Sequence, residues 1–176
     1  MNWSEFKHAE QVYDLKHLRS YTTSFERPAK GRRPVEKFSV NVTFSHHCFT
    51  RGLPRGESPY DLTLRFDHEG DLRIFDVGRL NLLKLLPDII AKLPARKCQQ
   101  TGKGNFMTIE MVAADGSKIE YEVFFRVWKQ RRGRIALHVD SAYVREEDYG
   151  SSRPKGMAID FYVILHNTLN EIPIHV

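Results

Sequence analysis

The stretch Lys118-Ile-Glu-Tyr-Glu-Val-Phe-Phe-Arg-Val-Trp128 decides the fold, because apolar and polar side chains alternate along most of it. A period of two is typical of a β-strand with one buried face. The same alternation recurs in Arg134-Ile-Ala-Leu-His-Val-Asp-Ser-Ala-Tyr-Val144, and Arg131-Arg-Gly133 supplies turn chemistry between the two runs. We therefore predict an antiparallel hairpin. Its expected buried face carries Ile119, Tyr121, Val123, Phe125, Val127, Ile135, Leu137 and Val139.

Two further runs extend this hairpin into a four-stranded antiparallel meander. Residues 106–112 form the predicted first strand, which a turn at Asp115-Gly116 joins to the hairpin. Residues 158–165 form the predicted last strand, because Ile159, Phe161, Val163 and Leu165 again alternate with polar residues. The connection at 145–156 is predicted as a long loop.

A helix from about Arg79 to Leu93 precedes the meander. Its leucines and isoleucine recur at three- and four-residue spacing, which gives a wide apolar stripe that must be buried. Pro87 lacks an N–H and clashes with the preceding turn, so we expect a kink or two short helices. The predicted fold class is α+β: an antiparallel β-sheet meander covered by one main helix, with an additional β-rich N-terminal region.

The length of 176 residues fits a single domain, residues 1–176. Residues 1–78 are the β-rich N-terminal region, and residues 79–167 hold the helix and the four-stranded sheet. In residues 1–78, the other expected elements are a short helix within 1–20, strands at 21–26 and 35–44, an irregular stretch at 45–59, and a hairpin of strands 62–66 and 72–75. After the predicted helix, a polar connector is expected at 95–104.

Composition excludes several classes of protein. A hydrophobic fraction of 41% is too high for a disordered chain, and charges interrupt the longest apolar run, Leu80 to Leu93, so no membrane span or membrane partner is expected. The segment Met1 to Glu10 has no apolar signal region, which favours a cytoplasmic location. Two cysteines in that compartment predict no disulfide. The net charge of +5, with 27 basic against 22 acidic residues, leaves nucleic acid as a candidate partner.

The polar face of the predicted sheet carries candidate catalytic groups: Glu122, Arg126, His138 and His166. A carboxylate, a guanidinium and imidazoles are the groups that metal-independent RNA cleavage needs. A base removes the 2′-hydroxyl proton, an acid protonates the leaving oxygen, and a cation stabilises the phosphate. The alternative is an ordinary solvent-exposed sheet face whose charges pair across strands.

A basic segment at the tip of the predicted hairpin is a candidate nucleic-acid-binding surface. It contains Lys129, Arg131, Arg132 and Arg134, with Trp128 and Tyr162 as aromatic neighbours. Cations interleaved with aromatic rings suit phosphate contacts and stacking of unpaired bases. An ordinary exposed hairpin is the alternative interpretation.

The sequence Ser45-His46-His47-Cys48 suggests a further alternative, a zinc site formed by His46, Cys48 and Cys98, which His166 would complete. This spacing matches no zinc module, so the sequence predicts no metal. Single histidines that act in catalysis, or only hydrogen-bond within the core, are also compatible with the pattern. No glycine-rich phosphate loop is present, and no cofactor is predicted.

The passage from Tyr121 to Arg145 resembles the paired central strands of RelE-type toxins and, more broadly, of the barnase, colicin and RelE-like ribonucleases. The resemblance covers at most residues 79–167. It implies RNA as the substrate, endoribonuclease activity on the sheet face, and an antitoxin as a protein partner. A non-catalytic nucleic-acid-binding module and a protein-interaction module are the alternatives.

Overall fold

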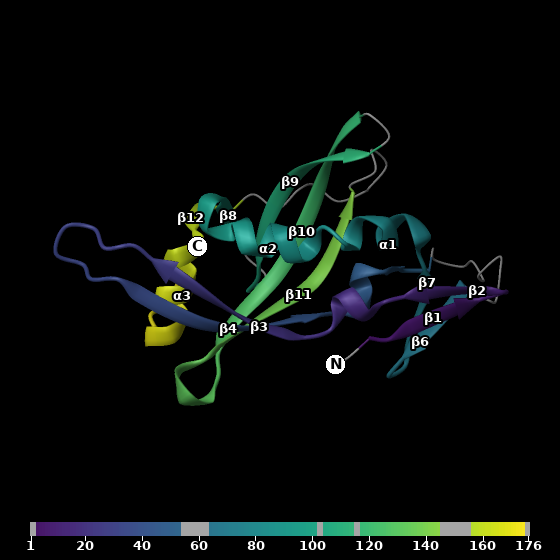
Figure 1. Ribbon diagram of the computed structural model, residues 1–176, viewed down its shortest axis with the longest axis horizontal. Helices are drawn as coiled ribbons and strands as arrows, with labels where there is room; N and C mark the ends of the chain where they lie inside the picture. The colour runs from purple at the N-terminus through teal and green to yellow at the C-terminus, as the bar shows by residue number, and fades with distance from the viewer. Residues whose placement is uncertain (1–2, 54–63, 102–103, 115–116, 145–155, 175–176) are drawn as a thin grey trace.

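The computed structural model describes residues 3–53, 64–101, 104–114, 117–144 and 156–174. Within these residues, seven strands form one twisted sheet in the order β12-β8-β9-β10-β11-β4-β3 (Figure 1). The strands are β3 (Tyr21–Arg27), β4 (Glu36–Phe44), β8 (Lys97–Gln100), β9 (Phe106–Ala114), β10 (Ser117–Lys129), β11 (Ile135–Val144) and β12 (Ala158–Asp160).

The predicted central hairpin is confirmed. β10 and β11 pair antiparallel with Arg126 opposite His138, and the short 3₁₀ turn η5 (Arg131–Gly133) joins them. Arg132 and Gly133 take positive φ angles of 60° and 66°, the backbone that such a tight connection requires. The expected apolar face is buried, with Tyr121, Val123, Phe125, Ile135, Leu137 and Val139 at most 1% exposed.

The prediction of a simple antiparallel meander is wrong, because the main sheet is mixed. β11 pairs with β4 in parallel, with His138 opposite Thr43, while every other adjacent pair among the described strands is antiparallel. β4 suits this central position because Phe38, Val40, Val42 and Phe44 alternate with polar residues and are at most 2% exposed. β3 and β4 therefore belong to the same sheet as the C-terminal strands.

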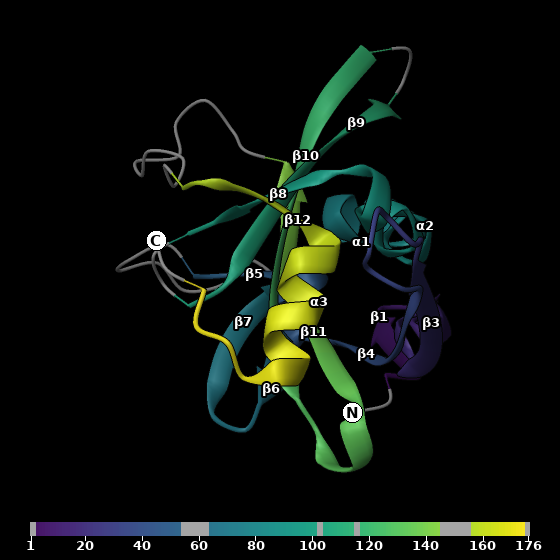
Figure 2. The same ribbon diagram turned by 90° about the vertical axis from the view of Figure 1, so that its left-hand side faces the viewer.

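The predicted last strand, 158–165, is also wrong. Only β12 is extended, and α3 (Phe161–Asn170) follows it directly. Phe161, Ile164 and Leu165 are fully buried at helical spacing, and the Phe161 ring lies 6.4 Å from that of Phe125. α3 thus covers the apolar face of β10 and β11, and Figure 2 shows it in front of these strands.

The expected helix near 79–93 is two short helices, α1 (Val77–Leu83) and α2 (Leu86–Lys92). Pro87 lies in the first turn of α2, where its missing N–H has no intrahelical partner to lose. The Asp76 side chain caps α1 by accepting a hydrogen bond from the Arg79 N–H at 3.0 Å. The apolar stripe of both helices is buried in the common core.

The helix predicted near the N-terminus is wrong, because β1 (Glu5–His8) and β2 (Gln11–Asp14) form a hairpin there, followed by the 3₁₀ turn η1 (Lys16–Leu18). Phe6 stacks on Phe75 at 4.0 Å, so alternate residues of β1 face the core. A separate three-stranded sheet contains β5 (Thr50–Arg51), β6 (Arg65–His68) and β7 (Asp71–Phe75), which confirms the predicted hairpin from residue 65 onward.

The predicted connector at 95–104 is not all loop, since it includes β8, and the 3₁₀ turn η4 (Leu93–Ala95) precedes that strand. The predicted turn at Asp115-Gly116, the predicted loop at 145–155 and residues 62–63 of a predicted strand lie outside the described residues. In the part of the chain that the structure describes, no helix has the length and apolar character to cross a bilayer.

Candidate functional site

Arg126, His138 and Asp140 form the polar centre on the face of the sheet opposite α3. Arg126 donates from Nε to Asp140 Oδ1 at 2.8 Å, and its Nη2 lies 2.7 Å from the same oxygen. His138 Nδ1 lies 2.8 Å from Thr43 Oγ1, and His138 Nε2 lies 4.0 Å from Asp140 Oδ1. Two of the four predicted catalytic residues, Arg126 and His138, are therefore direct cross-strand neighbours.

The surroundings of the His138 ring favour its neutral form. Partial burial lowers the pKa of His138 from its usual 6.5, Asp140 acts in the opposite direction, and Arg126 and His47 lower it further. A neutral imidazole at physiological pH has a nitrogen lone pair that can accept a proton. The arrangement therefore suits a general base beside a guanidinium.

Glu122 does not join this centre. It lies on the same face of β10 as Arg126, but four residues along a strand separate their Cα atoms by about 13 Å. Glu122 is also completely buried, whereas the predicted role requires contact with a substrate. The face is not uniformly open, since Phe124 is only 8% exposed.

His166 lies elsewhere, because the segment predicted as a strand is the helix α3. Its Nδ1 is 2.7 Å from Glu36 Oε1, and Arg27 Nη1 contacts the other oxygen of Glu36 at 2.8 Å. α3 packs on the apolar face of the sheet, so His166 and His138 are on opposite sides of it. The predicted catalytic quartet is thus divided into a pair, a buried acid and a distant histidine.

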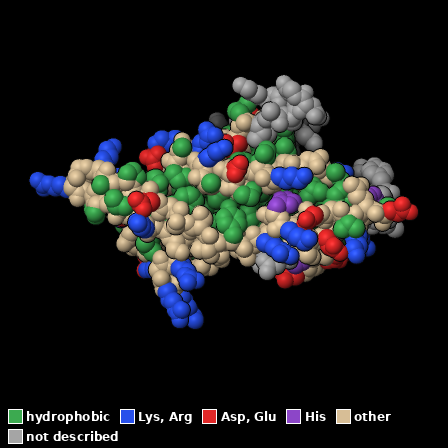
Figure 3. Space-filling view, in the orientation of Figure 1, with side chains coloured by type: hydrophobic (Ala, Val, Ile, Leu, Met, Phe, Trp, Pro, Cys, Tyr) green, Lys and Arg blue, Asp and Glu red, His purple; other side chains and the backbone are tan. Residues whose placement is uncertain are grey.

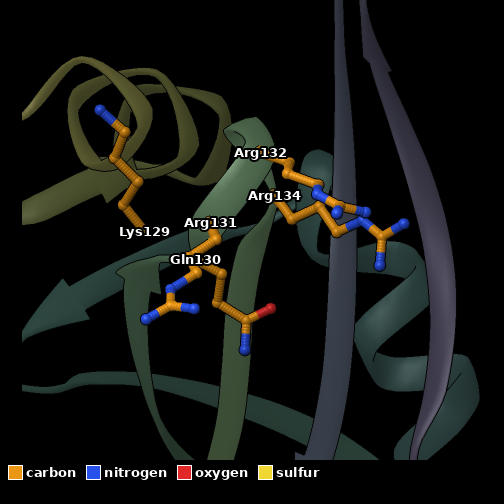
Figure 4. A pocket seen from close by; sticks show the side chains of 5 residues that line it. All are labelled: Lys129, Gln130, Arg131, Arg132 and Arg134. Carbon is orange, nitrogen blue, oxygen red and sulfur yellow. The ribbon is translucent and has the colours of Figure 1, made fainter.

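The basic hairpin tip forms an open, shallow hollow lined by Lys129, Gln130, Arg131, Arg132 and Arg134. Lys129 forms an ion pair with Glu171 at 2.8 Å, just beyond the C-terminal end of α3. Figure 4 shows Arg132 and Arg134 extending in a common direction, away from Lys129. Among the described residues, no carboxylate pairs with Arg131, Arg132 or Arg134.

Trp128 connects the hairpin tip to the polar centre. Its side chain is 44% exposed, and its ring centroid lies 6.4 Å from that of His138. Tyr162 does not share this surface, because it lies on α3 and donates from its hydroxyl to the Glu26 carbonyl at 2.7 Å. Figure 3 shows basic side chains projecting from the molecule at the hairpin tip and at the β3–β4 connection.

The alternative zinc set of His46, Cys48 and Cys98 is not assembled. Cys48 packs against β11 and Cys98 belongs to β8, and three strand spacings between these strands amount to about 14 Å. Both thiols are buried, and burial raises the pKa of each to about 12, which disfavours the thiolate that binds zinc. Both cysteines are free.

A different group of side chains meets at His46. Its Nε2 and that of His47 lie 2.9 and 2.8 Å from one oxygen of Asp71. The pair of histidines is visible in the sequence, but Asp71 is not an evident partner because it starts another strand 24 residues later. The signal that was available is an acidic residue directly after the Glu69-Gly70 turn, at the start of the hairpin's second strand.

Comparisons with known proteins identify one family. The model of the YjaZ family matches residues 5–169. The chain is similar to protein YjaZ of Escherichia coli (strain K12), with 29% identity over 169 residues, which is 95% of this chain and 90% of the relative. No solved structure matches.

Proposed function

The chain belongs to the YjaZ family, and we propose that it binds single-stranded RNA through the tip of the β10–β11 hairpin. The observation that carries this proposal is the position of exposed Trp128 between His138 and cations that no described carboxylate contacts. Arg131, Arg132 and Arg134 would contact phosphates, and the indole would stack on an unpaired base. In this proposal the RNA partner is cytoplasmic.

The tip is suited to a strand rather than to a duplex. Its hollow is shallow and is formed by one hairpin turn, whereas a double-stranded RNA reader must span about 16 base pairs. An exposed aromatic ring has a stacking partner only where bases are unpaired. The contact surface therefore favours a short single-stranded segment.

The test is the salt dependence of binding, measured by the fluorescence anisotropy of a labelled oligouridine. The variant Arg131→Ala/Arg132→Ala should flatten the log–log slope by about 1.4, since each lost phosphate contact on a single strand contributes about 0.7. Lys7→Ala/Lys16→Ala is the matched control, because it removes the same charge from side chains paired with Glu5 and Asp14. Equal effects of the two variants would contradict the proposal.

Trp128 gives an independent test of stacking. Trp128→Ala should weaken RNA binding by about 1–3 kcal/mol if one base stacks on the ring. The salt slope should stay unchanged, because no cation is removed. Unchanged affinity of Trp128→Ala would show that the ring does not contact RNA.

RNA cleavage is a second candidate function, favoured by one observation: Arg126 and His138 are cross-strand neighbours with Asp140 beside both. His138 would remove the 2′-hydroxyl proton as the 2′-oxygen attacks the phosphorus, which forms a 2′,3′-cyclic phosphate and breaks the bond to the 5′-oxygen; that oxygen would take its proton from solvent. Arg126 would exchange Asp140 for the scissile phosphate. In this proposal neither Glu122 nor His166 contacts the RNA. A toxin-like activity of this kind would have an antitoxin as partner, a protein whose carboxylates cover the basic tip.

His138→Ala separates cleavage from binding. A positioned general base contributes about 10²–10⁴-fold to a rate, so the variant should lose cleavage in EDTA while it keeps its affinity for RNA. His166→Ala is the matched control and should cleave as the wild type does. If the wild type cuts no RNA, the protein is a binding module.

A further inference from the structure

Three potential metal ligands converge at one end of the three-stranded sheet. His46 and His47 are consecutive in the 3₁₀ turn η2 (His46–Cys48), and Asp71 is the first residue of β7. One ligand atom from each of them lies within 4.8 Å of the other two. Two imidazole nitrogens and a carboxylate oxygen are a donor set that zinc and neighbouring transition metals accept.

The backbone that carries the two histidines is held by several hydrogen bonds. The Ser45 hydroxyl accepts from the His47 N–H at 3.2 Å, and the Thr50 hydroxyl donates to the His46 carbonyl at 2.9 Å. Arg79 donates to the carbonyls of His47 and Thr50 at 3.1 and 2.6 Å. The turn is therefore fixed by contacts that leave both Nε2 atoms directed at Asp71.

His68 adds a second, independent observation. It is the cross-strand partner of Asp71, and its ring lies 5.0 Å from that of His46. Its Nε2 is buried and has no hydrogen-bond partner among the described residues. Buried polar atoms are nearly always satisfied, so this nitrogen, on a ring packed against His46 but outside the group of three donors, calls for a partner that the described residues do not supply.

We propose that His46, His47 and Asp71 bind a divalent transition-metal ion of the zinc class. Metal–ligand bonds of about 2.0–2.2 Å place tetrahedral ligands about 3.3 Å apart. The two nitrogen–oxygen distances of 2.9 and 2.8 Å need to open by only a fraction of an ångström to admit the ion. This inference does not depend on RNA binding.

The site has an open side. The side chains of His47 and Asp71 are 39% and 44% exposed, whereas that of His46 is 12% exposed and lies against the rings of Trp3 and Phe66. Three protein ligands and a solvent-facing fourth position characterise catalytic rather than structural zinc sites. A water molecule would occupy that position.

Arg73 sets a limit on the affinity of the site. Its Nη1 lies 3.7 Å from the Asp71 oxygen that both histidines contact. The positive charge of this guanidinium opposes the binding of a divalent cation beside it. We therefore expect tighter binding after Arg73→Gln, a direction that a purely structural cluster would not show.

The test uses full-length protein freed of metal with EDTA. Calorimetry with Zn²⁺, and the visible absorption of Co²⁺ as a probe of coordination, should show one bound equivalent for the wild type. His47→Ala and Asp71→Asn change separate elements and should each lower the affinity at least about tenfold, since changes even to outer partners of metal ligands have that effect. His166→Ala, which removes a histidine paired with Glu36, is the matched control and should bind as the wild type does.

Thermal melting of each variant in EDTA shows whether it folds. Zn²⁺ should raise the melting temperature of the wild type and of His166→Ala, and should raise that of the two ligand variants less, because only a bound ion stabilises the native state. Absence of binding by the wild type, or equal affinity in all variants, would overturn the proposal.

Discussion

The β10–β11 hairpin tip and the histidine cluster at η2 arrange polar groups in opposite ways. The tip gathers Arg131, Arg132 and Arg134 from six consecutive residues, 129–134, and leaves them without carboxylate partners among the described residues. The cluster joins His46 and His47 to Asp71 from another strand, and the three groups already contact one another. A surface that acts through net charge is encoded locally, whereas a site of converging donors depends on tertiary structure.

Truncating Phe49, which packs beneath the histidine cluster, should have the largest effect on the free energy of unfolding. Phe49 is fully buried, with its ring 5.2 Å from both Trp3 and Phe66, so Phe49→Ala should reduce the free energy of unfolding by about 3–5 kcal/mol. Urea unfolding measures this change. Trp128→Ala, an exposed aromatic at the tip, should change stability little, and a comparable loss would remove the distinction between the two regions.

Arg79→Ala should have the next largest effect and should act on one region only. Arg79 donates to the carbonyls of His47 and Thr50, and hydrogen bonds from a charged group contribute about 1.5–3 kcal/mol. Zinc affinity should fall because η2 is released, while the salt slope of RNA binding should not change. A change in that slope would show that the two regions are coupled.

Arg126→Ala should reduce the free energy of unfolding less than Arg79→Ala does. Its ion pair with Asp140 is half exposed, and such pairs contribute about 0–1 kcal/mol. We expect a small shift in the urea midpoint together with weaker RNA binding, since Arg126 lies beside Trp128 on the same face. A loss as large as that of Arg79→Ala would mean that Arg126 has a structural role.

The smallest expected effect is the dependence of the free energy of unfolding on pH. Burial lowers the pKa of His46 and of His138 below the usual 6.5, so the unfolded chain binds protons on these rings more readily than the folded chain does. Their contribution to stability is complete above pH 6.5 and is lost as the pH falls through the folded pKa values.

Urea unfolding in EDTA between about pH 7.5 and about pH 5.5 should therefore show stability decreasing on acidification, and His138→Gln should reduce that decrease. The salt slope of RNA binding should stay constant over the same range, because arginines do not titrate there. A stability that increases on acidification would contradict the inferred direction of the pKa shifts.

The strands that could be predicted from the sequence are those in which apolar and polar residues alternate, because this alternation shows which face is buried. β4, β10 and β11 show a period of two, and the parity predicted for Val123 and Leu137 is the one observed. The segment 158–165 could not be assigned this way, since Phe161, Val163 and Leu165 alternate while Phe161, Ile164 and Leu165 also fit a helix. Packing against Phe125 selects the helix.

The candidate site was predictable only where it follows one hairpin. Arg126, His138 and Trp128 were expected on one face, and the β10–β11 register places them together. Asp71 was not predicted, because no local pattern joins a strand's first residue to a turn 24 positions earlier. A β-bulge at the Phe124/Phe125 register shift leaves Asp140 without a cross-strand partner on β10 and changes the parity of β11, so that Ala142 is buried and Tyr143 is partly buried.

The parallel pairing of β4 with β11 has a consequence for folding and synthesis. Val40 meets Ile135 and Phe44 meets Val139, so about 90 residues separate strands that must be adjacent. On the ribosome, β3 and β4 emerge long before β11, and during that interval Phe38, Val40, Val42 and Phe44 present an uncovered apolar face beside an unpaired strand edge. Such an intermediate is prone to aggregate, and a chaperone that shields apolar strands would raise the yield of native protein.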